Sequence, residues 1–218
     1  IKTLVNAMTG VALPRLSKYL GENDTKSYNT MLSKMFHALL MIVLPCSIGL
    51  FFLSEKIILI LSGNGFISGA TSLKILAISL IFGTLSYCVV YAVLIPHKME
   101  GKCFVASITS AVVNVILNFI LIPIFSLNGA AVTTLISEIV VVAMNFFFAK
   151  KIVNISFLFD GLKSLIFSNI VVVLICLLVD YYIANVYWCI GVSLVLCFIV
   201  YFLLLFLFKD KVAYPIMH

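Results

Sequence analysis

The chain has 218 residues, of which 64% are hydrophobic and only 10% are charged, and its mean hydropathy is +1.26. Since about 25% of the residues in a soluble domain are charged, this composition excludes an ordinary soluble protein and indicates a surface that mostly faces lipid. The formal charge of +6 does not indicate a nucleic-acid partner, because the basic residues stand at the ends of apolar runs, where lysines set topology and meet lipid headgroups.

The first apolar run, 1–20, predicts part of a membrane-spanning helix with a kink or an end at Pro14. It carries Lys2, Asn6 and Thr9 at spacings of four and three, which places these side chains on one helical face. The chain starts inside this run without a basic leader segment or a cleavage site. We therefore expect it to be the C-terminal part of a longer protein.

The remaining apolar runs set the fold class. A spanning helix rises about 1.5 Å per residue, so roughly 20 apolar residues cross the hydrocarbon core. The short run 55–61 predicts an interfacial helix or the frayed end of the span before it. We interpret six other runs as full spans: 32–53, 73–95, 104–122, 129–149, 165–179 and 187–208. The expected fold is all-α, a polytopic transmembrane helix bundle forming one domain over 1–218, with these six spans and a partial first span.

Two of these spans, 104–122 and 129–149, form a helical hairpin, because a tight turn around Pro123 and Asn128-Gly129 joins them. Glu138 lies near the middle of the second span and is the only acidic residue well inside any span. An ionisable side chain at membrane depth is costly and usually functional. Glu138 is therefore the first candidate for a functional residue.

The basic residues are distributed unequally between the two ends of the spans. Eleven belong to one side: Arg15, Lys18, Lys26, Lys34, Lys98, Lys102, Lys150, Lys151, Lys163, Lys209 and Lys211. The other side has only Lys56 and Lys74, while Lys2 belongs to the partial span. Because cytoplasmic loops carry the excess of lysine and arginine, we expect the first side, and the C-terminus with it, to be cytoplasmic.

The loops offer few of the convergent polar groups that catalysis needs. The sequence has no paired aspartates for a metal-bound nucleotide, no glycine-rich phosphate loop and no nucleophile elbow. Its six cysteines form no CxxC pair and are interpreted as buried apolar thiols. We therefore expect no enzymatic activity, no metal site and no cofactor.

Polar side chains follow one face of each helix of the predicted hairpin. The two stripes are Ser107, Ser110, Asn114 and Asn118 on the first span, and Thr134, Glu138 and Asn145 on the second. Buried polar side chains are costly unless they face a partner or a wet cavity. The stripes therefore predict either hydrogen bonds between helices or a pathway wall. Glu138 favours the pathway, because hydrogen bonding between helices rarely needs a carboxylate.

Lys2 is a candidate partner for Glu138. Lys2 lies fourteen residues above the expected cytoplasmic exit at Leu16, and Glu138 lies twelve residues above Lys150. With a rise of about 1.5 Å per residue, the two depths match to about 3 Å. The sequence is therefore compatible with a Lys2–Glu138 ion pair, although it does not show that the two helices touch.

Several local features resemble a known family of transporters. They are Leu13-Pro14-Arg15-Leu16-Ser17 before a polar loop, a span containing Leu44-Pro45, the Asn114–Asn118 pair before a proline-containing turn, and Gly129-Ala130-Ala131 at the start of the Glu138 span. They resemble the second lobe of Wzx-type polysaccharide (O-antigen) flippases, within the superfamily of lipid II flippases and MATE drug exporters. The resemblance covers about residues 1–150, and the last two spans resemble the family only in topology.

The resemblance implies the second lobe of a two-lobed, alternating-access transporter in the bacterial inner membrane. Such a protein flips an undecaprenyl-diphosphate-linked oligosaccharide repeat unit, for O-antigen or a related polysaccharide. The expected partners are this substrate, membrane lipids, the missing N-terminal lobe, and the polysaccharide polymerase with its chain-length machinery. The candidate pathway or coupling residues are Glu138, Asn114, Asn118, Lys2, Asn6, Thr134 and Arg15. Among them, Lys2 and Arg15 are candidates for contact with the diphosphate.

Two alternatives remain open at this level. One is a polytopic enzyme of the same pathway, an O-antigen polymerase or a glycosyltransferase, which would carry a large polar loop. The other is a MATE-type exporter of cations or drugs. The sequence upstream of this chain would separate these classes, because a second, similar lobe indicates a transporter.

Overall fold

The computed structural model describes residues 2–153 and 162–208, and these residues form helices joined by short turns, without a strand among them. The elements are α1 (Lys2–Gly21), α2 (Thr25–Phe52), α3 (Ser54–Ser62), the 3₁₀ turn η1 (Asn64–Phe66), α4 (Gly69–Val89), the π-helical turn η2 (Val90–Leu94), α5 (Glu100–Ala149), α6 (Leu162–Tyr182) and α7 (Val186–Leu207). Within the described part of the chain, five helices are long and apolar enough to cross a membrane: α2, α4 with η2, α5, α6 and α7.

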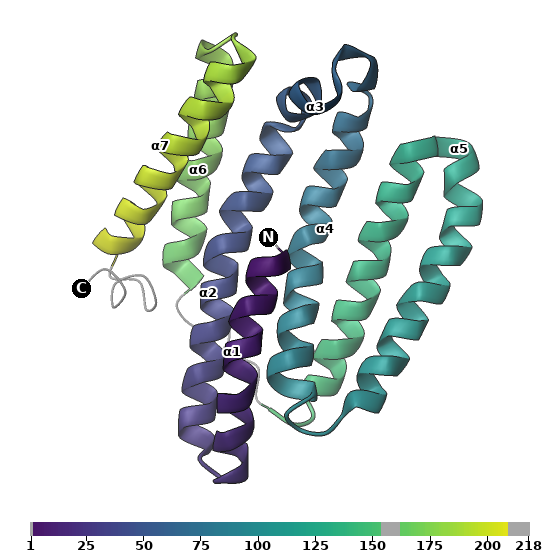
Figure 1. The fold of residues 1–218 in the computed structure, drawn as a ribbon, viewed down its shortest axis with the longest axis vertical. Helices are drawn as coiled ribbons and strands as arrows, with labels where there is room; N and C mark the ends of the chain where they lie inside the picture. Colours follow the sequence, from purple (N-terminus) through teal and green to yellow (C-terminus); the bar gives the residue numbers. More distant parts are fainter. Residues whose placement is uncertain (1, 154–161, 209–218) are drawn as a thin grey trace.

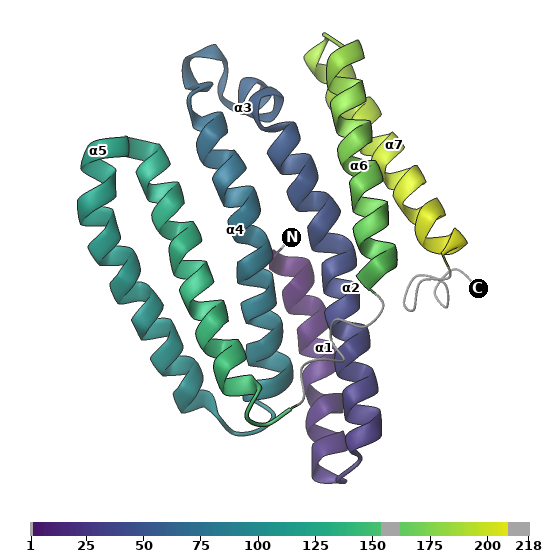
Figure 2. The same cartoon turned by 180° about the vertical axis from the view of Figure 1, so that it is seen from behind.

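Helix α5 is a hairpin of two arms, as the sequence predicted. Its backbone leaves the helical conformation at Ser126, where a φ of 50° and a ψ of −124° reverse the chain. The two arms, 100–125 and 127–149, run side by side in both views of the molecule (Figures 1 and 2). Gly129 permits their close approach, because a Cβ built there would lie 2.3 Å from the carbonyl oxygen of Leu121.

Helix α2 lies at the centre of the bundle. The helices α5, α4, α2 and α6 follow one another across the molecule, and α1 packs along α2 (Figure 1). Two buried tyrosines tie distant segments together, since the hydroxyl of Tyr28 donates to the carbonyl of Ala92 at 2.8 Å and that of Tyr201 donates to Met41 at 2.9 Å. Ser47 also donates a hydrogen bond to the carbonyl of Ala77. Helices α4 and α7 are thereby attached to opposite sides of α2.

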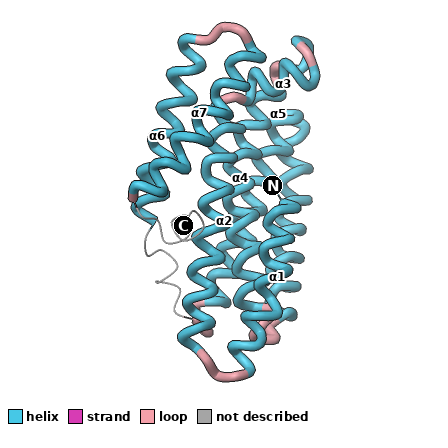
Figure 3. The backbone as a smooth tube through the Cα atoms, turned by 60° about the vertical axis from the view of Figure 1, so that its left-hand side comes forward, coloured by secondary structure: helices cyan, strands magenta, loops and turns pink. Residues whose placement is uncertain are grey.

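The connecting turns gather at the two ends of the bundle (Figure 3). The α1–α2 turn, the η2–α5 connection and the end of α5 share one end, and α3, the Ser126 turn and the α6–α7 turn share the other (Figure 1). Most described residues of the predicted basic side belong to the α1–α2 hairpin, the η2–α5 connection or the end of α5, at the first end, whereas Lys163 lies at the start of α6. Lys209, Lys211 and most of the predicted amphipathic segment after Lys151 lie outside the described residues.

The short run at 55–61 forms a separate helix, α3, at the end opposite the basic residues. Two ion pairs hold it there: Lys74 contacts Glu55 at 2.8 Å, and Lys56 contacts Asp180 at 2.8 Å. The Lys56 amine also donates to the thiol sulfur of Cys189 at 2.8 Å. Burial opposes the charge of Lys56, but its hydrogen bonds and the charge of Asp180 outweigh burial and raise its pKa. Helix α3 is thus attached to both α4 and the α6–α7 hairpin.

Asp24 begins α2 as its N-cap. Its side chain accepts a hydrogen bond from the backbone N–H of Ser27 at 3.0 Å. This hydrogen bond, with a smaller contribution from the charge of Lys26, lowers the pKa of Asp24 below its usual value. The cap satisfies a backbone donor that a helix start leaves without a partner, and so defines the turn between α1 and α2.

Candidate functional site

Glu138 lies on the second arm of α5, half-buried against α4. Its carboxylate packs against Gly83 of α4: a Cβ built on that glycine would lie 3.1 Å from the carboxyl carbon and from both carboxylate oxygens. Ser79, one helical turn before Gly83, is also buried. The Ser79–Gly83 pair of small residues therefore allows a close helix contact, and that contact is with the carboxylate-bearing arm.

The hairpin stripes are connected by hydrogen bonds between the two arms of α5. The amide nitrogen of Asn118 donates to the side-chain oxygen of Asn114 at 2.9 Å. The Asn118 oxygen lies 2.6 Å from the hydroxyl of Thr133, which is also 2.8 Å from the carbonyl of Ala130. On the same face, the Ser110 hydroxyl donates to a carbonyl of the opposite arm at 2.8 Å. Two of these contacts, Asn118–Thr133 and the one from Ser110, are the interhelical hydrogen bonds expected of polar residues in a membrane bundle. The Asn118–Asn114 hydrogen bond lies within the first arm.

Thr134 and Asn145 have different surroundings from those of the Asn114–Asn118 pair. The hydroxyl of Thr134 donates to the carbonyl of Ala130 at 2.9 Å within its own helix. Asn145 is buried and donates to the hydroxyl of Ser86 on α4 at 2.9 Å. The residue that crosses the hairpin to Asn118 is thus Thr133, which the polar spacing did not select because it lies one position away from the stripe.

The polar residues of α1 do not share one environment. Thr9 is buried and its hydroxyl lies 2.9 Å from the carbonyl of Val5, whereas the side chain of Asn6 is exposed. The side chain of Lys2 lies outside the described residues, and the Lys2–Glu138 ion pair stays a prediction. Arg15 is exposed, thirteen positions after Lys2 in α1 and thus about 20 Å along the helix. It belongs to the basic end of the bundle and not to the depth predicted for Glu138.

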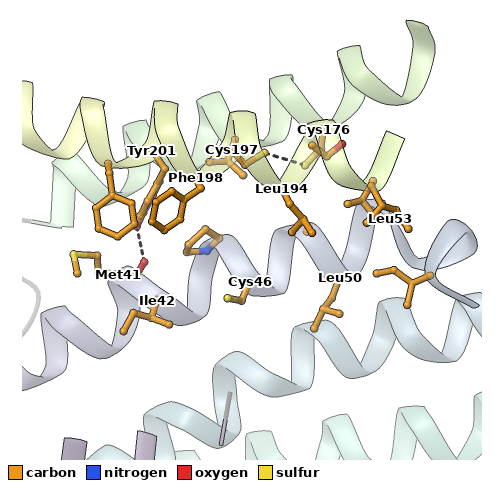
Figure 4. A pocket seen from close by; sticks show the side chains of 17 residues that line it. Met41, Ile42, Cys46, Leu50, Leu53, Cys176, Leu194, Cys197, Phe198 and Tyr201 are labelled. Atoms are coloured by element: carbon orange, nitrogen blue, oxygen red, sulfur yellow. Dashed lines mark hydrogen bonds between the residues drawn. The ribbon is translucent and has the colours of Figure 1, made fainter. Parts of the chain in front are cut away.

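A second feature, which the sequence did not predict, is an apolar groove between α2, α6 and α7 with a volume of about 640 Å³. Its lining includes Met41, Ile42, Cys46 and Leu50 of α2 and Leu194, Phe198 and Tyr201 of α7 (Figure 4). The Sγ atoms of Cys176 and Cys197 lie 3.8 Å apart beside it. The volume is in the range of small-molecule sites, and the lining is almost entirely hydrocarbon and sulfur.

The comparisons with known proteins agree on one class of transporter. A family model described as "Lipid II flippase MurJ" matches residues 2–165. The probable low-salt glycan biosynthesis flippase Agl15 of Haloferax volcanii is 26% identical over 165 residues, which are 76% of this chain and 35% of that protein. This chain therefore spans about a third of the length of the curated relative.

The structural comparison gives the same architecture. A structure of the lipid II flippase MurJ in an inward closed conformation matches with a TM-score of 0.75 and 22% sequence identity, over 92% of this chain and 42% of that one. The predicted fold, an all-α bundle of long apolar helices, is confirmed by this match, which covers less than half of that protein. The predicted superfamily of flippases is confirmed as well, while the assignment to its Wzx-type O-antigen branch is a finer statement.

Proposed function

Because the chain belongs to the family of the lipid II flippase MurJ, we propose that it is part of a transporter that moves a lipid-linked oligosaccharide across a membrane by alternating access. The observation that carries the proposal is the family match over residues 2–165, which covers α1 to α5 and includes Glu138. Members of this family are transporters and not enzymes, which argues against the polymerase and the glycosyltransferase. A missing N-terminal lobe would complete the pathway.

The substrate that we propose is an undecaprenyl-diphosphate-linked repeat unit of O-antigen or a related polysaccharide. The resemblance to Wzx-type flippases supports this class, as does the glycan biosynthesis named for the curated relative. The lysine-rich end of the bundle would face the cytoplasm, where such repeat units would be loaded, and the membrane would be the bacterial inner membrane.

The apolar groove between α2, α6 and α7 supports a lipid-linked substrate. Inside a bilayer, a groove of about 640 Å³ with this mostly apolar lining favours a hydrocarbon chain over a polar group. Side chains such as Leu194 and Phe198 present no strong hydrogen-bonding group to a sugar, so the groove suits the prenyl chain and not the glycan. The oligosaccharide would instead pass on the polar side of the lobe, together with the missing lobe.

Glu138 is the proposed coupling residue. Its carboxylate lies where the second arm of α5 touches Gly83, so a change of charge would act directly on the α4–α5 contact. Either the carboxylate gains and releases a proton during the cycle, or it stays charged and holds a basic side chain of the cavity wall, for which Lys2 is the candidate. The Asn118–Thr133 hydrogen bond would keep the two arms of α5 moving as one unit, while Asn114 would hold the Asn118 side chain in place within the first arm.

The test uses the complete gene in cells that lack their own copy, with surface display of the polysaccharide as the readout. Glu138→Gln should abolish display with unchanged expression, because it keeps hydrogen bonding and removes the charge. Glu138→Asp should restore display in part if titration is required. Glu55→Gln is the matched control, since Glu55 is an exposed carboxylate at the end of the bundle, paired with Lys74.

Display at the wild-type level from Glu138→Gln, at native expression, would show that the carboxylate is not needed. The polar residues of the hairpin would then be interpreted as interhelical hydrogen bonding alone. If deletion of the whole gene causes no display defect, the proposed substrate class is rejected. The role of the Glu138 carboxylate would then have to be measured with a different transported substrate.

A further inference from the structure

A second groove, distinct from the apolar one, runs between α1 and α2 at the basic end of the bundle. Its volume is about 780 Å³. Three basic side chains line it: Arg15 from α1, and Lys26 and Lys34 from α2. Arg15, Lys26 and Lys34 lie far apart in the sequence from the hairpin that carries Glu138, and the proposed transport mechanism uses neither lysine.

Among the described residues, only one of these three basic side chains, Lys26, has a carboxylate acting on it, that of Asp24. Among the residues that the structure describes, Arg15 and Lys34 form no ion pair. Glu22 is 3.7 Å from Lys18, which does not line the groove. Asp24 caps α2, and the charge of Lys26 acts on its carboxylate, so one of the three positive charges of the groove is partly compensated. The groove is therefore a place of net positive charge with room for an anion.

The lining also changes character along the groove. Toward the α1–α2 turn it has Tyr19, Lys26 and Ser27, and farther into the bundle it has the apolar side chains Met8 and Val11. Lys26 and Lys34 are eight residues apart, about 12 Å along α2. Lysine can bury its hydrocarbon stem while its amine stays at the polar level. The ligand that matches this arrangement has an anionic head and a hydrocarbon chain.

We propose that the α1–α2 groove binds an anionic phospholipid from the cytoplasmic leaflet, with the phosphate beside Arg15, Lys26 and Lys34 and an acyl chain along Met8 and Val11. Basic pockets between transmembrane helices on the cytoplasmic side are the kind of site that recognises lipid headgroups. The proposal rests on the orientation given above, in which the lysine-rich end is cytoplasmic. It does not depend on the identity of the transported cargo.

The site can be tested by native mass spectrometry of the full-length protein released from detergent micelles, with phosphatidylglycerol and phosphatidylcholine as the added lipids. The wild type should bind phosphatidylglycerol more tightly. A basic residue near the membrane surface contributes about fivefold to the affinity for anionic lipid. Arg15→Gln with Lys34→Gln should therefore weaken phosphatidylglycerol binding roughly 25-fold and leave phosphatidylcholine unchanged. Lys18→Gln, at the same end of α1 but outside the groove, should have no effect.

Three results would overturn the proposal. The first is equal binding of the two lipids by the wild type. The second is unchanged phosphatidylglycerol binding in the double variant, which would also be the outcome if a segment preceding this chain covered the groove. The third is a selective loss of undecaprenyl diphosphate binding with phosphatidylglycerol binding retained, because the groove would then be a substrate site. Lys26→Gln provides an independent variant, and thermal unfolding of each variant checks that a lost signal is not a lost fold.

Discussion

Replacing Gly129 with alanine should separate the two arms of α5. The added methyl group would lie 2.3 Å from the carbonyl oxygen of Leu121, 2.7 Å from its carbonyl carbon and 3.1 Å from the nitrogen of Ile122. Non-bonded heavy atoms prefer about 3.5–4.0 Å. All three neighbours are backbone atoms, so no side-chain rotation relieves the clash. The arms must therefore move apart by about 1 Å, the shortfall from that contact distance.

The size of the effect follows from three contributions. Overpacking costs about 1–3 kcal/mol. Separation of the arms also weakens the Thr133–Asn118 and Ser110–Ser137 hydrogen bonds, which together contribute about 1 kcal/mol at the average measured for membrane helices. Alanine recovers about 1 kcal/mol through its higher helix propensity. The net prediction is a loss of about 1–3 kcal/mol in the free energy of unfolding.

The measurement is unfolding of the full-length protein in mixed micelles of increasing denaturing detergent. Gly191→Ala is the matched control, because Gly191 is exposed within α7 and a Cβ there would meet no atom within 4 Å. That variant should be as stable as the wild type or more stable by up to about 1 kcal/mol. If Gly129→Ala behaves like Gly191→Ala, the arms do not touch at this point and the explanation of the hairpin is wrong.

Three further predictions concern single positions. Ser126→Gly should stabilise the protein by about 1 kcal/mol, since a φ of 50° with a ψ of −124° suits glycine; a loss of stability in the same unfolding measurement would contradict this. Asp24 has a lowered pKa, so its capping contribution is present above about pH 4 and is lost as the pH falls through the lowered value; Asp24→Asn should keep the cap and remove this pH dependence, while Asp24→Ala should lose the cap at every pH. Gly83→Ala should displace the carboxylate of Glu138 by a few tenths of an ångström and reduce surface display at unchanged expression, whereas Gly191→Ala should leave display intact. If both variants display the polysaccharide equally, the position of the carboxylate does not matter for transport.

The protein class and the order of the spans could be predicted from the sequence, and the assignment of loops to the cytoplasmic side stays a prediction. These depend on local properties: apolar length, the turn residues around Pro123 and Gly129, and lysines at helix ends. The position of Glu138 near the middle of its arm could be predicted for the same reason, because position along a helix is simply a count of residues. The hairpin is the clearest case, since both arms and their turn are adjacent in the chain.

The contacts between side chains of different helices could not be predicted from the sequence. An apolar helix without a polar face does not reveal its rotation about its own axis, and one residue corresponds to about 100° of rotation. This is why Thr133, and not Thr134, contacts Asn118. Gly83 reaches Glu138, and Arg15 shares a groove with Lys34, through the packing of separate helices. Such contacts depend on the offset and rotation of two helices at once, and neither quantity is contained in the spacing of residues along one of them.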